Sequence, residues 1–163
     1  MPQTRLYSPL LLLLIFSIGG CGSGDDEADS GSSSTTPTLT SLWESSFSGC
    51  GLNCHSASAA DSTENGPNLT TKSSFYSSLV NRQASDYPNW LKNGNCDQVK
   101  FITPGDAANS SLLASLDQGY ADTLGATYNC TPSINLHRAI SVSLSAANRD
   151  NLVTWINSGA MNN

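Results

Sequence analysis

The chain has 163 residues and a formal net charge of −6 at pH 7, and charged residues make up only 12% of it. This length leaves room for one modest domain once the ends are discounted. The seven basic residues are few and scattered, which argues against nucleic acid as a partner, because phosphate recognition needs clustered positive charge. A low content of charged residues with many small polar ones is typical of exported proteins.

Residues 1–20 have the pattern of a signal peptide. Arg5 supplies a positive charge, and the segment Leu10–Ile18 is apolar except for Ser17. Such a run is too short to cross a bilayer, which takes about 20 apolar residues in a helix. Small residues follow it, as they do before a signal-peptide cleavage site. We therefore expect this segment to direct export and to be removed.

The sequence Ile18-Gly19-Gly20-Cys21 resembles the bacterial lipobox, in which an apolar residue and two small residues precede a cysteine. By that resemblance Cys21 becomes the acylated first residue of the mature protein, and its acyl chains contribute about 0.8 kcal/mol of membrane binding per buried CH₂. Gly22 stands where many inner-membrane lipoproteins have Asp. We therefore expect a lipid anchor in the outer membrane, with the protein facing the periplasm or the cell surface and with no other membrane contact. A soluble secreted protein is the alternative.

Residues 21–40 are expected to form the acylated cysteine and a disordered tether. After Cys21 the segment consists mainly of Gly, Ser, Thr and acidic residues and has no apolar periodicity. A flexible linker of this length has a root-mean-square reach of roughly 25 Å. The folded domain is then expected to span residues 41–163.

Apolar residues at helical spacing predict four helices in this domain. The first two are marked by Leu42, Trp43 and Phe47, and by Phe75, Tyr76, Leu79 and Val80. The last two are marked by Leu112, Leu113 and Leu116, and by Leu152, Val153 and Ile156. Strand signals are weak, and the intervening segments carry Gly, Pro and Asn. We therefore expect an all-α domain with long loops.

Small polar residues in front of these patterns predict where the helices begin. The candidate N-caps are Thr71 or Ser73 for the second helix, Asn109 or Ser110 for the third, and Ser143 or Ser145 for the last. Gly159 is expected to end the last helix, and the first is expected to run to Cys50. Because so loop-rich a domain has little apolar core, a cofactor or a cross-link would help it to fold.

Four cysteines remain once Cys21 is assigned to lipid, namely Cys50, Cys54, Cys96 and Cys130. An even number of cysteines in an exported chain favours disulfide or thioether chemistry over free thiols. Four cysteines allow three disulfide pairings by counting alone.

The segment Cys50-Gly51-Leu52-Asn53-Cys54-His55 resembles the haem-attachment site of c-type cytochromes. The usual form has two cysteines separated by two residues and followed at once by histidine. The thiols add to the haem vinyl groups, and the histidine binds the iron. This chain has a three-residue spacer, and Gly51 suits the unusual backbone angles that would let one residue loop out.

Further segments are similar to small c-type cytochrome domains, in the order found in that family. With the motif included they read LWESSFSGCGLNCHS, GPNLTTKSSFYSSLVN, ITPGDAANSSLLASL and LSAANRDNLVTWINSGA, and they cover nearly all of residues 41–161. The resemblance implies a cytochrome c-like helical fold, one covalent haem c on Cys50 and Cys54, and His55 as the proximal iron ligand. It also implies electron transfer with redox partner proteins rather than catalysis.

The distal ligand in that family lies in the loop before the closing helix, where this chain has His137. Met161, which follows that helix, is the less favoured candidate, and an open sixth position is the remaining alternative. A bis-histidine iron has a lower potential than a histidine–methionine iron. The resemblance further implies that Cys96 and Cys130, which lie in loops outside the short family core, form a disulfide.

Other functions are also compatible with these residues. A haem enzyme with a peroxidase-like or gas-binding role would require an open sixth position. A non-haem envelope or adhesion lipoprotein, stapled by Cys50–Cys54 or by other disulfides, would need no cofactor. A zinc module of Cys50, Cys54, His55 and His137 has suitable ligand types, but exported thiols seldom stay reduced.

Overall fold

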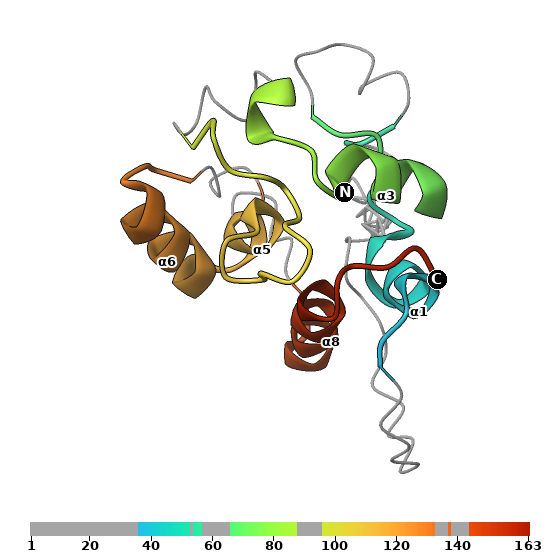
Figure 1. The fold of residues 1–163 in the computed structure, drawn as a ribbon. Helices are drawn as coiled ribbons and strands as arrows, with labels where there is room; N and C mark the ends of the chain where they lie inside the picture. Colours follow the sequence, from blue (N-terminus) through green and yellow to red (C-terminus); the bar gives the residue numbers. More distant parts are fainter. Residues whose placement is uncertain (1–35, 53, 57–65, 88–95, 133–136, 138–143) are drawn as a thin grey trace, which may run out of the picture.

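The computed structural model describes residues 36–52, 54–56, 66–87, 96–132, 137 and 144–163 (Figure 1). The signal peptide, Cys21 and the tether as far as residue 35 lie outside these residues, and so do Asn53 and Ser143. The described part is helical and contains no strand, and its sheet-like pairing is limited to three isolated bridges. The expectation of helices joined by long loops is confirmed. No helix of this part is long and apolar enough to span a membrane.

The predicted first helix consists of α1 (Leu39–Leu42) and a π-helical turn, η1 (Trp43–Phe47). It begins at Thr38, whose side chain accepts a hydrogen bond from the Ser41 amide in a capping box. It ends at Phe47 rather than at Cys50, which lies in the turn that follows.

The folded part begins three residues earlier than the expected boundary at Ser41. Leu39 is fully buried, and its amide donates to the side-chain oxygen of Asn163. Thr40 donates from both its amide and its hydroxyl to the Asn163 carbonyl. Residues near the start of the domain are therefore bonded to Asn163, and residues 38–40 belong to the folded part.

The helix α3 (Lys72–Leu79) begins at Thr71, one of the two expected N-caps, which forms a capping box with Ser74. After α3 the chain runs beside residues 99–102, with hydrogen bonds that include Asn81 N to Ile102 O and Ala84 N to Val99 O. A short 3₁₀ turn, η2 (Ala84–Asp86), follows. Through these bonds, the loop that precedes α5 is held against the chain that follows α3.

The predicted third helix is α5 (Ser111–Leu116), with Ser110 at its N-cap position. The Ser110 hydroxyl does not cap the helix, because it accepts from the Thr103 amide instead and donates to the Asp106 carbonyl. A helix that was not predicted, α6 (Gln118–Tyr128), follows directly and packs on α5. Asp117 caps α6 at its start, and Asn129 ends it in the left-handed conformation.

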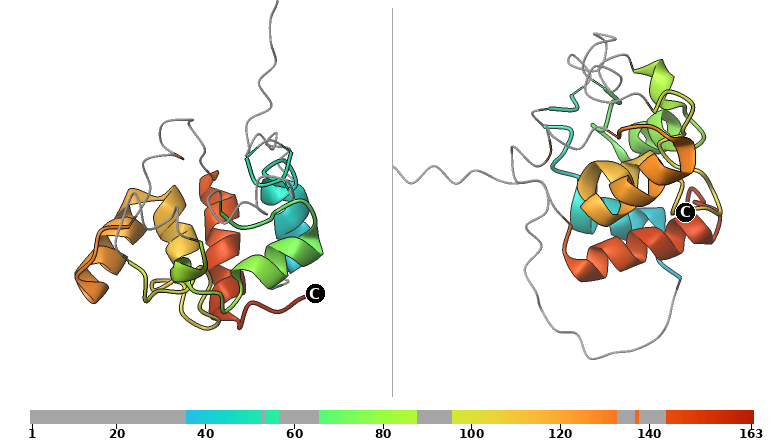
Figure 2. Two further views of the ribbon diagram at one scale, coloured as in Figure 1. Left: turned by 90° about the horizontal axis from the view of Figure 1, so that it is seen from above. Right: turned by 90° about the vertical axis from the view of Figure 1, so that its left-hand side faces the viewer.

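The closing helix, α8 (Ala146–Asn157), begins at the expected cap Ser145 and is followed by Gly159 at φ +101°. It lies between α5 and α6 on one side and α1 and α3 on the other (Figure 2). Trp155 is 1% exposed and is part of the core, as expected from the sequence. With Trp155, α8 contributes Leu152 and Ile156 to the core, and the surrounding helices contribute residues that include Leu39, Leu42, Phe47, Phe75, Leu79 and Leu113.

The disulfide between Cys96 and Cys130 is present, as expected. Cys96 lies just before residues 99–102, which bond to the chain after α3, and Cys130 follows Asn129 at the end of α6. The disulfide therefore links these two parts of the fold. Cys96 is fully buried, so the cross-link belongs to the core rather than to the surface.

Candidate functional site

The motif Cys50–His55 forms a tight loop directly after η1. The Cys50 amide donates to the Phe47 carbonyl at 3.0 Å, and the His55 amide donates to the Cys50 carbonyl at 3.2 Å. The Leu69 amide then donates to the His55 carbonyl at 2.9 Å. These bonds fold the motif back on itself and attach it to the segment before α3.

Gly51 is the point of closest approach between the motif and that segment. A β-carbon on this residue would overlap the carbonyl oxygen of Leu69 and lie 2.5 Å from the α-carbon of Thr70. The next residue, Leu52, is 77% exposed. The glycine of the three-residue spacer therefore faces the protein backbone, while the bulk of Leu52 extends into solvent.

The imidazole of His55 is held by the segment Gly66–Pro67. Its Nδ1 lies 2.9 Å from the Pro67 carbonyl oxygen, and a β-carbon on Gly66 would lie 3.6 Å from the ring. A carbonyl oxygen can only accept a hydrogen bond, so Nδ1 carries the proton and Nε2 keeps its lone pair. Metal-binding histidines in proteins are usually oriented in this way.

His137 is held in the same manner by the end of α5. Its Nδ1 lies 3.1 Å from the carbonyl oxygen of Ser115, one of the last carbonyls of that helix, so this ring also keeps a lone pair on Nε2. The last carbonyls of a helix have no partner within the helix and are available to such a donor. Among the described residues, neither His55 nor His137 has a hydrogen bond to Nε2.

The structure brings these two rings together. The ring centroids of His55 and His137 are 6.2 Å apart, with an angle of 41° between the ring planes. Two imidazoles that bind one metal ion through Nε2 from opposite sides need a centroid separation of about 6.3 Å, given metal–nitrogen bonds of about 2.0–2.1 Å and a ring radius of about 1.1 Å. By their separation alone, the rings are far enough apart to hold one metal ion between them.

Burial lowers the pKa of both histidines below the ordinary value of 6.5. The hydrogen bonds to the Pro67 and Ser115 carbonyls oppose this shift, while the neighbouring His137 lowers the pKa of His55 further. Both rings are therefore neutral at pH 7, which is the form that binds metals.

The two cysteines of the motif differ in state. Cys54 is a free and exposed thiol, whereas Cys50 is disulfide-bonded. The expected staple Cys50–Cys54 of the non-haem alternative is therefore not formed, and a thioether at Cys50 requires its disulfide to be reduced first.

A metal site built from protein ligands alone is not found in the described part of the chain, where no three His, Cys, Asp or Glu side chains gather. The zinc module expected from Cys50, Cys54, His55 and His137 therefore has no support there. Met161, the less favoured distal ligand, is 56% exposed, and its carbonyl accepts the Trp155 indole N–H.

Sequence reasoning named both histidines but missed the groups that orient them. Pro67 and Ser115 act through backbone carbonyls, which every residue has, so no side-chain pattern marks them. The Gly66–Pro67 pair lies in the second family-like segment and was the one available signal. Comparison with known protein families, with curated proteins and with solved structures finds no match for this chain.

Proposed function

We propose that this chain is an electron-transfer lipoprotein of the c-type cytochrome kind, with one haem attached at Cys50 and Cys54. His55 would be the proximal ligand of the iron and His137 the distal ligand. The observation that carries the proposal is the separation of 6.2 Å between the two imidazoles, each with Nδ1 bonded to a carbonyl. The resemblance of four segments to small c-type cytochrome domains supports it from the sequence.

A metal ion between these rings needs further ligands. The described residues offer no third side chain of a ligating type beside the pair. A haem would bring its other iron ligands itself, so it would need from the protein only His55 and His137. This favours haem over a bare metal ion.

Within such a site the chain controls what the iron can do. Haem iron supplies one-electron redox chemistry. His55 and His137 would both hold the iron, which would favour electron transfer over the binding of oxygen or peroxide. Their bonds to Pro67 and Ser115 make the imidazoles more basic, and two nitrogen ligands hold the potential below that of a histidine–methionine pair.

The location and partners belong to the same proposal. A signal peptide and an acylated Cys21 would anchor the protein in the outer membrane, and the tether would let the domain meet redox partner proteins.

A second candidate is a non-haem envelope lipoprotein stabilised by disulfides. The buried Cys96–Cys130 bond favours it. In this function Cys50 never carries a thioether, and the two histidines are a packed pair without a metal.

The test uses the full chain, expressed in a host that processes lipoproteins and attaches haem. Intact mass and reduced-minus-oxidised absorption spectra are measured after denaturation and in the native state. The proposal predicts one haem that remains bound on denaturation. It also predicts that Cys50→Ser or Cys54→Ser weakens the attachment, while the paired change Cys96→Ala/Cys130→Ala does not.

Two outcomes would reject the proposal. A colourless protein from cells that mature a control cytochrome would leave the disulfide-stabilised lipoprotein as the function. Haem that is fully removed by denaturation from the unaltered protein would show that the motif cysteines do not attach it. Replacing His137 by Ala is expected to abolish the low-spin ferric spectrum while the haem stays attached.

A further inference from the structure

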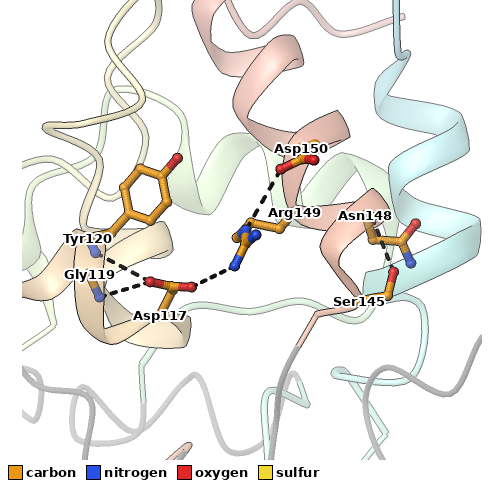
Figure 3. Close-up of polar contacts among 7 residues, drawn as sticks. All are labelled: Asp117, Gly119, Tyr120, Ser145, Asn148, Arg149 and Asp150. Atoms are coloured by element: carbon orange, nitrogen blue, oxygen red, sulfur yellow. Dashed lines mark hydrogen bonds and ion pairs between the residues drawn. The ribbon is translucent and has the colours of Figure 1, made fainter.

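Asp117 lies at the junction of α5 and α6 and is bonded to both. Its amide donates to the Leu113 carbonyl in α5 at 2.9 Å. Its carboxylate oxygen Oδ1 accepts from the amides of Gly119 at 2.9 Å and Tyr120 at 3.4 Å, which caps α6 (Figure 3). A single residue therefore determines how the two helices meet.

Arg149 connects this junction to α8. Its Nη1 donates to the second carboxylate oxygen of Asp117 at 3.0 Å, from the first turn of α8 (Figure 3). The pair is partly protected, since the side chains of Arg149 and Asp117 are 39% and 29% exposed. Arg149 also lies 3.8 Å from Asp150, a more exposed partner at longer distance.

The contact crosses a gap in the packing. A pocket of ≈ 90 Å³ is lined by Leu113, Leu116, Asp117, Leu144 and Arg149. Asp117 and Arg149 both line this pocket, so their ion pair joins the α5–α6 junction to α8 at a place where the packing is incomplete.

The same helix end carries the acceptor for His137. The Ser115 carbonyl lies two residues before Asp117 and receives the Nδ1 proton of His137 at 3.1 Å. The Ser115 side chain is satisfied within α5, because its hydroxyl donates to the Leu112 carbonyl at 2.7 Å. With only six residues, α5 is too short to be stable by itself and depends on its neighbours for its position.

We propose that Arg149 is a positioning residue for the distal ligand: through Asp117 it fixes the end of α5, and thereby the carbonyl that orients His137. The inference rests on the proposed function, because His137 is a distal ligand only if haem is bound. Arg149 itself does not contact either histidine; it acts through Asp117 and the last turn of α5.

The test compares haem-loaded wild-type protein with Arg149→Gln and Asp117→Asn. We expect haem content to stay the same and the rate of carbon monoxide binding to the ferrous protein to rise, because a less firmly held imidazole leaves the iron more often. The rise should be about two- to fivefold, the effect of a partly exposed ion pair. The double variant should exceed neither single variant, and Arg149→Lys should recover part of the wild-type rate.

A matched control is Arg82→Gln. Arg82, which precedes η2, forms an exposed ion pair with Asp86 of η2 at 3.1 Å, and neither residue belongs to α5 or α8. This change should leave the carbon monoxide rate unaltered. An equal rise in the control would show that loss of any ion pair loosens the domain and would overturn the inference.

A haem-free readout separates the inference from the proposed function. In the unloaded chain, the Nδ1 proton of His137 should exchange with solvent about two- to fivefold faster in Arg149→Gln, as followed by nitrogen-resolved NMR. Unchanged exchange and unchanged carbon monoxide binding would overturn the inference, even if the variant melts at a lower temperature. Absence of haem from the wild-type protein would instead reject the proposed function.

If Arg149→Gln does not fold, the inference is tested by measuring how the carbon monoxide binding rate of the wild-type protein depends on salt concentration. Salt screens a partly exposed pair, so the carbon monoxide rate should rise with ionic strength. In the Arg82→Gln control the same rise should remain. A rate that does not change between low and high salt would contradict the role assigned to Arg149.

Discussion

The carbonyl oxygen of Leu69 occupies the position that a β-carbon on Gly51 would take. The loop with the two motif cysteines therefore packs against the segment before α3 only because residue 51 has no side chain. We expect Gly51→Ala to destabilise the folded domain by about 1–3 kcal/mol, the usual cost of overpacking. Urea denaturation of the full chain measures this change.

Gly49 provides the matched control for this prediction. A β-carbon at Gly49 would have no atom within 4 Å, so Gly49→Ala should change the free energy of unfolding by no more than about 0.5 kcal/mol. The two variants make the same chemical change two residues apart in one loop. Equal effects of both substitutions would contradict the close approach of Gly51 to Leu69.

The start of α3 offers a second comparison. The sequence left Thr71 and Ser73 as alternative caps, and the structure assigns the cap to Thr71, whose hydroxyl accepts from the Ser74 amide at 3.0 Å. We expect Thr71→Ala to cost about 1 kcal/mol of stability and Ser73→Ala to cost much less. Thermal or urea unfolding monitored by circular dichroism would show the difference. A larger loss of stability for Ser73→Ala than for Thr71→Ala would contradict the assignment of Thr71 as the N-cap of α3.

Four of the helices could be predicted because each buries a stripe of large apolar residues at helical spacing. The helix α6 could not, since its only buried side chains are Ala121 and Leu124 and it contains Gly119 and Gly125. Its position depends instead on the cap at Asp117 and on packing against α5. Tertiary contacts of this kind leave no periodic pattern in the sequence.

The candidate site was also predicted only in part: its two histidines were named from the sequence, but the backbone groups that orient them were not. His55 could be named from its place after Cys54, and His137 from its place before the closing helix. The separation of their rings could not be predicted, because it depends on where Gly66–Pro67 and the end of α5 lie in space. Leu39 was assigned to the tether because its neighbours are polar, although the contacts with Asn163 bury it.

The Cys96–Cys130 disulfide should contribute strongly to stability, because it closes a long loop at a sequence separation of 34. In the chain-entropy model a loop of this length is worth about 4 kcal/mol. We expect Cys96→Ala/Cys130→Ala to lower the free energy of unfolding by about that amount, as measured by urea denaturation without reductant. Adding reductant should bring the wild-type protein to the stability of the reduced variant, because the disulfide of Cys50 is then reduced in both proteins. Equal stability of the two without reductant would contradict the prediction.

Asp117 gives the domain a predictable dependence on pH. Burial raises the pKa of its carboxyl group, but the hydrogen bond from Arg149 and those from the Gly119 and Tyr120 amides together outweigh burial. The net effect is a pKa below the ordinary value of 3.8. Since the folded state binds this proton less readily than the unfolded state, the ionised carboxylate stabilises the fold above pH 3.8. That contribution disappears as the pH falls through the lower, folded-state pKa.

Asp117→Asn should therefore be less stable than the wild-type protein at pH 7 and should approach it in stability as the medium becomes strongly acidic. Urea denaturation at a series of pH values from 7 down to 2 gives the difference in unfolding free energy at each. The gap should narrow only below pH 3.8, because the group is ionised in both states above that value. Arg149→Gln should lose part of the same acid dependence, since Arg149 donates the hydrogen bond to Asp117. A gap that stays constant to pH 2 would show that the carboxylate charge does not hold the junction of α5 and α6.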